Sequence, residues 1–145
     1  INNNMRGDSI MLDGNNSNFP KRGEIWYANL NEAIGSQQGG IRPVLIYSDN
    51  AYNRSSTTIM AIPLTSKLYK RSPVHVNIKA CKVNGLTKDS AVEIEKMRDI
   101  NKFQLIKCIG RISEFDDFRI AAKFPIMYPS LGILRKSDAF TCQMA

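Results

Sequence analysis

The stretch Gly39-Gly40-Ile41-Arg42-Pro43-Val44-Leu45-Ile46 carries the strongest structural signal in this chain. The apolar residues that follow Pro43 predict a buried strand, and the glycine pair before it predicts a loop that leads tightly into that strand. Arg42 stands at the beginning of the strand, because a residue before proline favours extended backbone. The sequence therefore places one arginine, Arg42, at the start of an apolar strand.

Further strands are predicted on both sides of this stretch from short runs rich in β-branched, aromatic and alternating apolar residues. The predicted strands, including the one above, cover residues 24–30, 43–47, 57–64, 74–78, 90–95 and 107–112. Pro63 lies within the third of these runs and predicts an edge strand or a bulge there.

Helical segments are predicted at three places between the strands and after them. Ser48 is a plausible cap for a helical turn over 48–54, and Asn101 for a short helix over 102–106. A longer helix is predicted to follow Ser113 and to run from Glu114 to about Phe124, with acidic residues in its first turn. Pro125 and Pro129 are expected to stop it.

Several short strands with turn signals between them, followed by one terminal helix, predict a mostly β fold: a small, largely antiparallel β-barrel with short helices. The asparagine-rich residues 1–20 are expected to be a disordered leader, and residues 21–145 a single domain. No apolar run approaches the length needed to span a bilayer, and no secretory signal is recognisable. A cytoplasmic protein without membrane contact is the default expectation.

The charge of the chain is positive and unevenly distributed. The net charge is +7, and residues 21–113 hold 15 Lys or Arg against 7 Asp or Glu. Such a body attracts polyanions, with nucleic acid as the first candidate and acidic protein segments as the second; simple solubility is the alternative. The three cysteines form no CxxC pair, so neither a structural zinc site nor a disulfide framework is expected.

Common catalytic signatures are missing from the sequence. There is no GxSxG, HExxH, GxxxxGK[ST] or GxGxxG motif. The carboxylates between Asp89 and Asp99 are interspersed with bases and do not suggest a two-metal cluster, so no metal or other cofactor is expected. RNA offers a metal-free route, because its own 2′-hydroxyl can attack the adjacent phosphorus and expel the 5′-oxygen.

Arg42 and Thr65 are the candidates for assisting such an attack. A guanidinium offers a planar fork of donors for phosphate oxygens, and its high pKa favours electrostatic stabilisation over proton abstraction. Thr65 ends an apolar strand and could orient a phosphoryl oxygen or the attacking hydroxyl, and Lys67, Lys70 and Arg71 follow it. The alternatives are a surface charge for Arg42 and an ordinary strand-end residue for Thr65.

Other residues have weaker signals for RNA binding. His75 is the single histidine and alternates with Val74 and Val76, so it is expected to face outward, with or without a role in acid–base chemistry. Tyr27 could stack on a base. Loop residues Ser36, Gln37 and Gln38 could contact base edges, or the loop could simply be solvated.

Several segments taken together resemble the MazF/PemK family of toxin endoribonucleases. The resemblance is colinear over about residues 20–113, and its most specific element is the GGxRPVLI stretch. The segments are Lys21–Leu30, Gly35–Ile46, Ala61–Thr65, Pro73–Val76, Leu86–Ser90 and Glu95–Arg98.

The resemblance implies an SH3-like barrel that forms a homodimer and acts as the toxin of a type II toxin–antitoxin system. It implies metal-independent cleavage of single-stranded mRNA at short sequences, leaving 2′,3′-cyclic phosphate and 5′-hydroxyl ends and inhibiting translation and growth. It also implies a cognate antitoxin with an acidic tail, and contact with operator DNA only through the antitoxin complex.

Site residues follow from the same resemblance. It makes Arg42 and Thr65 catalytic. The expected RNA-binding residues, including the lysines that follow Thr65, are Tyr27, Ser36, Gln37, Gln38, Lys67, Lys70, His75 and Lys96. Related sequences often have an acidic residue at the position of Gln37 and a glutamine at that of Lys96, which leaves the base preference open. In the family the terminal helix usually continues where Pro125 and Pro129 interrupt it here.

Two other functions remain alternatives. The first is a non-catalytic toxin with the same barrel, which binds a protein target such as a topoisomerase. The second is a basic RNA-binding module without turnover. Both predict that RNA is recovered intact.

Overall fold

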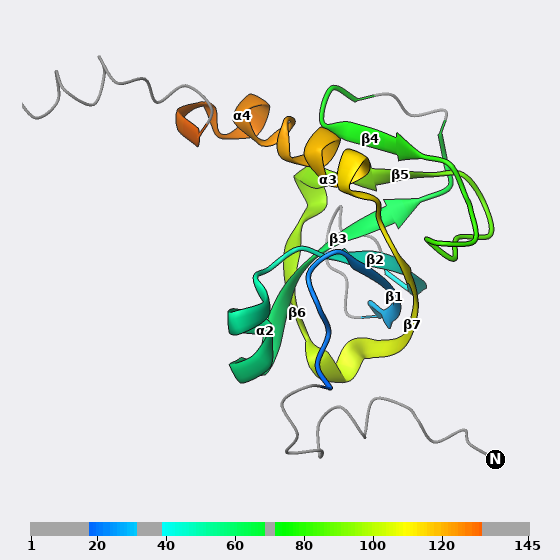
Figure 1. The fold of residues 1–145 in the computed structure, drawn as a ribbon, viewed down its shortest axis with the longest axis vertical. Coiled ribbons are helices and arrows are strands. Elements are labelled where there is room, and N and C mark those ends of the chain that lie inside the picture. The colour runs from blue at the N-terminus through cyan, green and yellow to red at the C-terminus, as the bar shows by residue number, and fades with distance from the viewer. Residues whose placement is uncertain (1–17, 32–38, 69–71, 132–145) are drawn as a thin grey trace, which may run out of the picture.

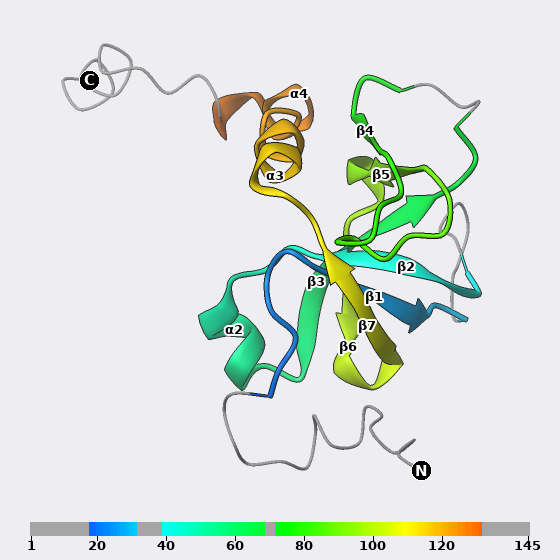
Figure 2. The same ribbon diagram turned by 45° about the vertical axis from the view of Figure 1, so that its right-hand side comes forward.

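The computed structural model describes residues 18–31, 39–68 and 72–131. Within these residues the protein is built mainly from β-strands, drawn in Figures 1 and 2. The strands are β1 (Glu24–Asn29), β2 (Ile41–Ile46), β3 (Thr58–Thr65), β4 (His75–Ile78), β5 (Ser90–Glu93), β6 (Arg98–Asn101) and β7 (Leu105–Arg111).

Short helices connect and follow these strands. The described α-helices are α2 (Asn50–Ser55), α3 (Glu114–Ala121) and α4 (Phe124–Met127). Single 3₁₀ turns form η1 (Ile94–Lys96), η2 (Lys102–Gln104) and η3 (Pro129–Leu131). Among the described residues no helix combines the length and the apolar character that a membrane crossing requires.

All the strand pairs are antiparallel, in the order β4-β5-β3-β2-β1-β7, with β6 added beside β3. The long strand β3 joins two parts of the sheet, since β6 pairs with its first half and β5 with its last two residues. Figure 2 shows β4 and β5 above this junction and β1, β6 and β7 below it. The predicted mostly β, antiparallel fold with a C-terminal helix is confirmed.

The sequence predicts that Pro63 marks an edge strand or a bulge. Pro63 lies in the interior of the sheet, and its register with β2 is regular, so neither alternative is found there. It faces Val44 of β2. On the other side of β3, the pairing with β6 ends at Ala61 and the pairing with β5 begins at Leu64. Proline has no amide hydrogen to donate. It is tolerated at this position because no described strand pairs with Pro63 in the gap between β6 and β5.

The core consists of two clusters on opposite faces of the strands. Ile25 and Leu45 belong to one cluster, whereas their neighbours Trp26 and Val44 belong to the other, as the period of two along a strand requires. Helix α3 contributes Ile120, which has no exposed surface, to the first cluster. The helix therefore closes the barrel on the side of β4 and β5 (Figure 1).

The predicted caps are correct in two cases and wrong in one. Asn101 caps η2 in a reciprocal capping box with Gln104, and the Ser113 hydroxyl accepts the amide of Asp116 at 3.0 Å. Helix α2 is capped by Asp49, whose carboxylate accepts the Ala51 amide at 2.9 Å. Ser48 does not cap this helix, because its hydroxyl accepts the amide of Met60 at 3.0 Å and ties the turn to β3.

Two of the predicted helices end earlier than expected. The helix capped by Asn101 stops at Gln104, and the helix that follows Ser113 stops at Ala121. Pro125 does not act as a terminator, since it lies in the first turn of α4, where a missing amide hydrogen costs nothing.

The described chain begins inside the predicted leader. Phe19 and Pro20 are buried. The Lys21 ammonium lies 4.3 Å from the centre of the Phe19 ring, and the Arg54 guanidinium of α2 lies 5.2 Å from it. Residues 1–17 of the leader and residues 132–145 of the predicted domain lie outside the described residues.

Candidate active site

A cavity of about 320 Å³ opens beside the beginning of β2 and the end of β3. The loop before β5 closes its other side. Its lining residues are Tyr27, Ile41, Arg42, Pro43, Leu64, Thr65, Ser66, Lys67, Leu86, Thr87, Lys88 and Ser90. Residues 39–46 therefore lie beside the end of β3 at one concave site.

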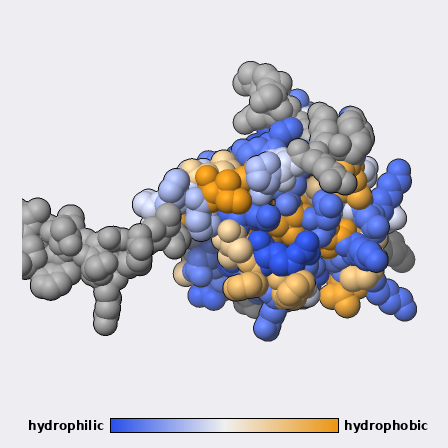
Figure 3. All heavy atoms as spheres, turned by 90° about the horizontal axis from the view of Figure 1, so that it is seen from above, coloured by the Kyte–Doolittle hydropathy of each residue, from blue (hydrophilic) through white to orange (hydrophobic). Residues whose placement is uncertain are grey.

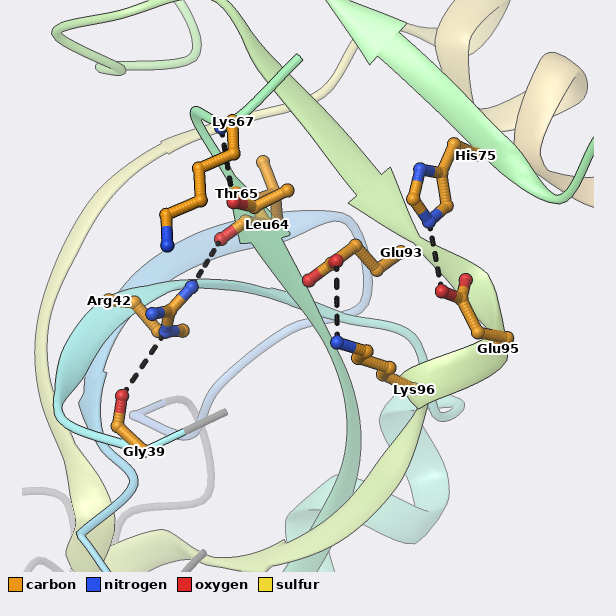
Figure 4. A network of polar contacts seen from close by, with 9 residues as sticks. All are labelled: Gly39, Arg42, Leu64, Thr65, Lys67, His75, Glu93, Glu95 and Lys96. Carbon is orange, nitrogen blue, oxygen red and sulfur yellow. Dashed lines mark hydrogen bonds and ion pairs between the residues drawn. The ribbon is translucent and has the colours of Figure 1, made fainter. Parts of the chain in front are cut away.

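Arg42 is held at the rim of this cavity by backbone carbonyls. Gly40 has a φ of 79°, a left-handed conformation that favours glycine, and it turns the chain into β2. The Arg42 Nε donates to the carbonyl of Gly39 and its Nη1 to the carbonyl of Leu64, both at 3.4 Å (Figure 4). The guanidinium is thus positioned next to the end of β3.

Thr65 is the last residue of β3, and its side chain lies beside Arg42 in Figure 4. It is only 6% exposed. Its Oγ1 accepts a hydrogen bond from the Lys67 amide at 3.1 Å, which fixes the turn that follows the strand. A hydroxyl can accept and donate at the same time, so the hydrogen of Thr65 remains able to reach an oxygen in the cavity.

The cavity is electropositive. Arg42, Lys67 and Lys88 line it, and its lining residues include no carboxylate. Burial lowers the pKa of the Arg98 guanidinium, and the positive charge of Arg42 lowers this pKa further. Concave walls of one charge sign attract an anion of the opposite sign, such as a phosphodiester.

The structure brings together four of the residues predicted from sequence: Tyr27, Arg42, Thr65 and Lys67. Four others, Ser36, Gln37, Gln38 and Lys70, lie outside the described residues. His75 and Lys96 do not line the cavity and belong to a second polar cluster (Figure 4).

The second cluster corrects the expectation that His75 faces outward. Its side chain is only 8% exposed, and its Nε2 lies 2.9 Å from Glu95 Oε2. Phe118 and Arg119 of α3 line a hollow together with His75, so the helix screens this end of β4 from solvent. Lys96 Nζ lies 3.7 Å from Glu93 Oε2.

Sequence reasoning missed four polar groups of the cavity wall: Ser66, Thr87, Lys88 and Ser90. The last three stand in the segment Leu86–Ser90, which carried part of the family resemblance but was given no role. Their composition alone is that of an ordinary polar loop. Only the pairing of β5 with the end of β3, which aligns Ala91 with Thr65, brings this loop to the cavity.

Comparison with known proteins gives consistent results at the level of sequence. A family model described as "PemK-like, MazF-like toxin of type II toxin-antitoxin system" matches residues 21–127. Endoribonuclease EndoA of Bacillus subtilis is 38% identical over 98 residues, which cover 67% of this chain and 81% of that protein. Endoribonuclease MazF of Staphylococcus saprophyticus is 35% identical over 95 residues, covering 65% and 78% respectively.

Solved structures share the fold. MazF from Deinococcus radiodurans aligns with a TM-score of 0.67 at 22% identity, over 77% of this chain and 97% of that one. The Mycobacterium tuberculosis toxin MazF-mt6 aligns with a TM-score of 0.62 at 23% identity, over 73% and 96%. Because the family model covers most of the chain and the Bacillus relative is matched over most of its length, this chain belongs to the PemK-like, MazF-like toxins of type II toxin–antitoxin systems.

Proposed function

We propose that this chain, an endoribonuclease toxin by its family, cleaves single-stranded mRNA without a metal ion, in the cavity that holds Arg42 and Thr65. The observation that carries the proposal is the meeting of these two side chains in one cavity. A guanidinium and a buried hydroxyl line it together with two lysines, and none of the described lining residues is a carboxylate. This arrangement suits a phosphodiester that becomes more negative as it reacts.

The reaction uses the substrate's own nucleophile. The 2′-oxygen forms a bond to the adjacent phosphorus as its proton departs, and the bond from phosphorus to the 5′-oxygen breaks. The products are a 2′,3′-cyclic phosphate and a 5′-hydroxyl, once the leaving oxygen has gained a proton. Arg42 stabilises the charge on the phosphoryl oxygens through two parallel N–H donors, and the Thr65 hydroxyl orients one of these oxygens.

RNA binding extends the site beyond the reacting phosphate. Tyr27 offers a ring face for a base, and Lys67 and Lys88 neutralise neighbouring phosphates. The predicted roles of Ser36, Gln37, Gln38 and Lys70 in contacting the strand remain part of the proposal. His75 and Lys96 would contact RNA only further along the surface, because neither lines the cavity.

Partners follow from the same family. An antitoxin with an acidic segment would bind the positive cavity and exclude RNA, and operator DNA would be reached only through that complex. A homodimer is supported by large exposed side chains on the C-terminal helices, among them Phe115 at 69% and Phe118 at 70%. Figure 3 shows separate hydrophobic groups among hydrophilic residues on the molecule seen from above, which leaves apolar surface for such contacts.

The decisive experiment incubates the purified full chain with end-labelled single-stranded RNA in excess EDTA. Cleavage should continue, and the new ends should be a 5′-hydroxyl, which polynucleotide kinase can label directly, and a cyclic phosphate. Cleavage that stops in EDTA and returns with Mg²⁺ would refute the mechanism. Intact RNA under all conditions would instead favour the topoisomerase-binding toxin or the RNA-binding module.

A further inference from the structure

A second group of potential ligands lies outside the cavity, on β4, β5 and the turn that follows β5. His75, Glu93 and Glu95 each offer one donor atom, and the three donor atoms lie within 4.8 Å of one another. Figure 4 shows the imidazole and the Glu95 carboxylate pointing toward each other, whereas the Glu93 carboxylate points toward Lys96. The antiparallel register aligns His75 directly with Glu93.

Two of these side chains are buried and incompletely satisfied. The side chains of His75 and Glu93 are 8% and 3% exposed. Within the described part of the chain, neither His75 Nδ1 nor Glu93 Oε1 has a hydrogen-bond partner. Buried polar atoms nearly always have partners, and a buried carboxylate without one is costly. Lys96 compensates the carboxylate only in part, because its Nζ lies 3.7 Å away and its side chain remains 26% exposed.

We propose that His75, Glu93 and Glu95 bind a divalent transition-metal ion, with Zn²⁺ as the preferred ion. One imidazole nitrogen and two carboxylate oxygens are a donor set that Zn²⁺ uses in proteins, with water in the remaining position. Tetrahedral bonds of about 2.0–2.2 Å place ligand atoms about 3.3–3.6 Å apart. His75 Nε2 and Glu95 Oε2, now 2.9 Å apart, would have to separate slightly to admit the ion, and any donor pair farther apart than this, up to the 4.8 Å limit, would have to approach. Glu95, whose side chain is 33% exposed, has the freedom to make this movement.

The proposed ion has a role separate from RNA cleavage, which needs no metal. It adds a second positive partner to the buried Glu93 carboxylate, for which it competes with Lys96. Because Thr65 is aligned with Ala91, which lies two residues before Glu93, the cluster occupies the same face of the sheet as the catalytic threonine. The ion would therefore change the charge beside the RNA-binding surface without entering the cavity.

The single histidine of the chain makes the test direct. We expect that titrating the purified full chain with Zn²⁺ shifts the ring ¹⁵N and ¹H NMR signals of His75 until one equivalent is bound, and that EDTA reverses the shift. Imidazole signals that do not move at saturating Zn²⁺ would overturn the proposal. This readout requires no variant and no RNA, so its failure would leave the proposed nuclease function intact.

Calorimetric titration of variants identifies the remaining ligands. Loss of a residue that only hydrogen-bonds a metal ligand weakens metal affinity by about 10- to 100-fold. His75→Ala and Glu93→Gln each remove a ligand itself, so each should weaken Zn²⁺ binding by more than that. Asp99→Asn is the matched control, because it removes an exposed carboxylate of β6 that is not part of the cluster, and it should leave the affinity unchanged. Equal affinities in Asp99→Asn and Glu93→Gln would contradict the assignment of Glu93.

The cysteines need their own control, since thiolates also bind Zn²⁺. Cys81 and Cys108 are exposed. A variant with all three cysteines changed to serine should bind Zn²⁺ as tightly as the unaltered chain. Loss of the one-equivalent binding in that variant would place the ion on sulfur and overturn the proposed site.

Discussion

The cavity at Arg42 and the cluster at His75 lie on one face of the same sheet but have opposite electrostatic designs. In the cavity the Arg42 guanidinium donates to two backbone carbonyls, and the described lining residues include two lysines and no carboxylate. In the cluster two carboxylates lie beside a histidine and a lysine. The first arrangement keeps positive charge available for a phosphate, whereas the second accumulates negative charge suited to a cation.

This difference bears on how each site is oriented. In the cavity the carbonyls of Gly39 and Leu64 orient the Arg42 guanidinium. A guanidinium presents a planar fork of donors whose geometry suits a phosphate. The acidic residues of β5 and η1 are instead directed to His75 and Lys96, outside the cavity.

Removing the guanidinium should have the largest effect. We expect Arg42→Ala to reduce the cleavage rate by about 10²- to 10³-fold or more. In other enzymes, removing one hydrogen-bond donor that stabilises the charge of the transition state has an effect of this size. Single-turnover cleavage of labelled RNA measures it. Arg54→Ala is the matched control, because Arg54 lies on α2 and does not line the cavity. Equal rates for the two variants would remove Arg42 from the mechanism.

Removing the hydroxyl alone should have the next largest effect. Thr65→Val keeps the shape of the side chain and loses its hydrogen bonds, so we expect a reduction in rate of about 10- to 100-fold, the value of a hydrogen bond to a charged group. Thr65→Ser should restore most of the activity. If Thr65→Val cleaves at the normal rate, Thr65 has only a structural role in the turn that contains Lys67.

The lysines of the cavity wall should affect binding more than chemistry. Lys67→Ala and Lys88→Ala should each weaken the affinity for single-stranded RNA and lower the slope of log K against log salt by about 0.7, because each removes one phosphate contact. Affinity measured at several salt concentrations tests this. An unchanged slope in both variants would show that neither Lys67 nor Lys88 contacts an RNA phosphate.

The smallest effect is expected in the acidic cluster. Glu93→Leu removes a buried carboxylate whose Oε1 has no partner among the described residues, and the partly exposed Lys96 can then be solvated. Because the cost of burying that unpaired oxygen is lost, we expect a gain of about 1 kcal/mol in the free energy of unfolding. Urea denaturation in EDTA measures this gain. The same variant should lose the stabilisation that Zn²⁺ gives to the unaltered chain. Marked destabilisation in EDTA would instead mean that Glu93 is held by a partner that matters to the fold.

The sequence alone predicted most of the local structure and the chemistry of the candidate residues, although it did not predict β6. Strand propensity and apolar alternation predict most strands to within a few residues, and Asn101 and Ser113 identify two helix starts because caps depend on local backbone geometry. The position of Arg42 at the start of a strand follows in the same way, since a glycine pair and a proline act only on their neighbours.

Tertiary structure decided which residues meet, because contacts between strands distant in the sequence cannot be inferred from local patterns. Arg42 reaches the carbonyl of Leu64 only because β2 pairs with β3, and Lys88 reaches the cavity only because β5 pairs with the end of β3. The alternation of valines predicts an outward His75, yet packing of α3 and pairing with Glu93 bury its ring. Burial depends on what covers a strand, and that information lies in the fold.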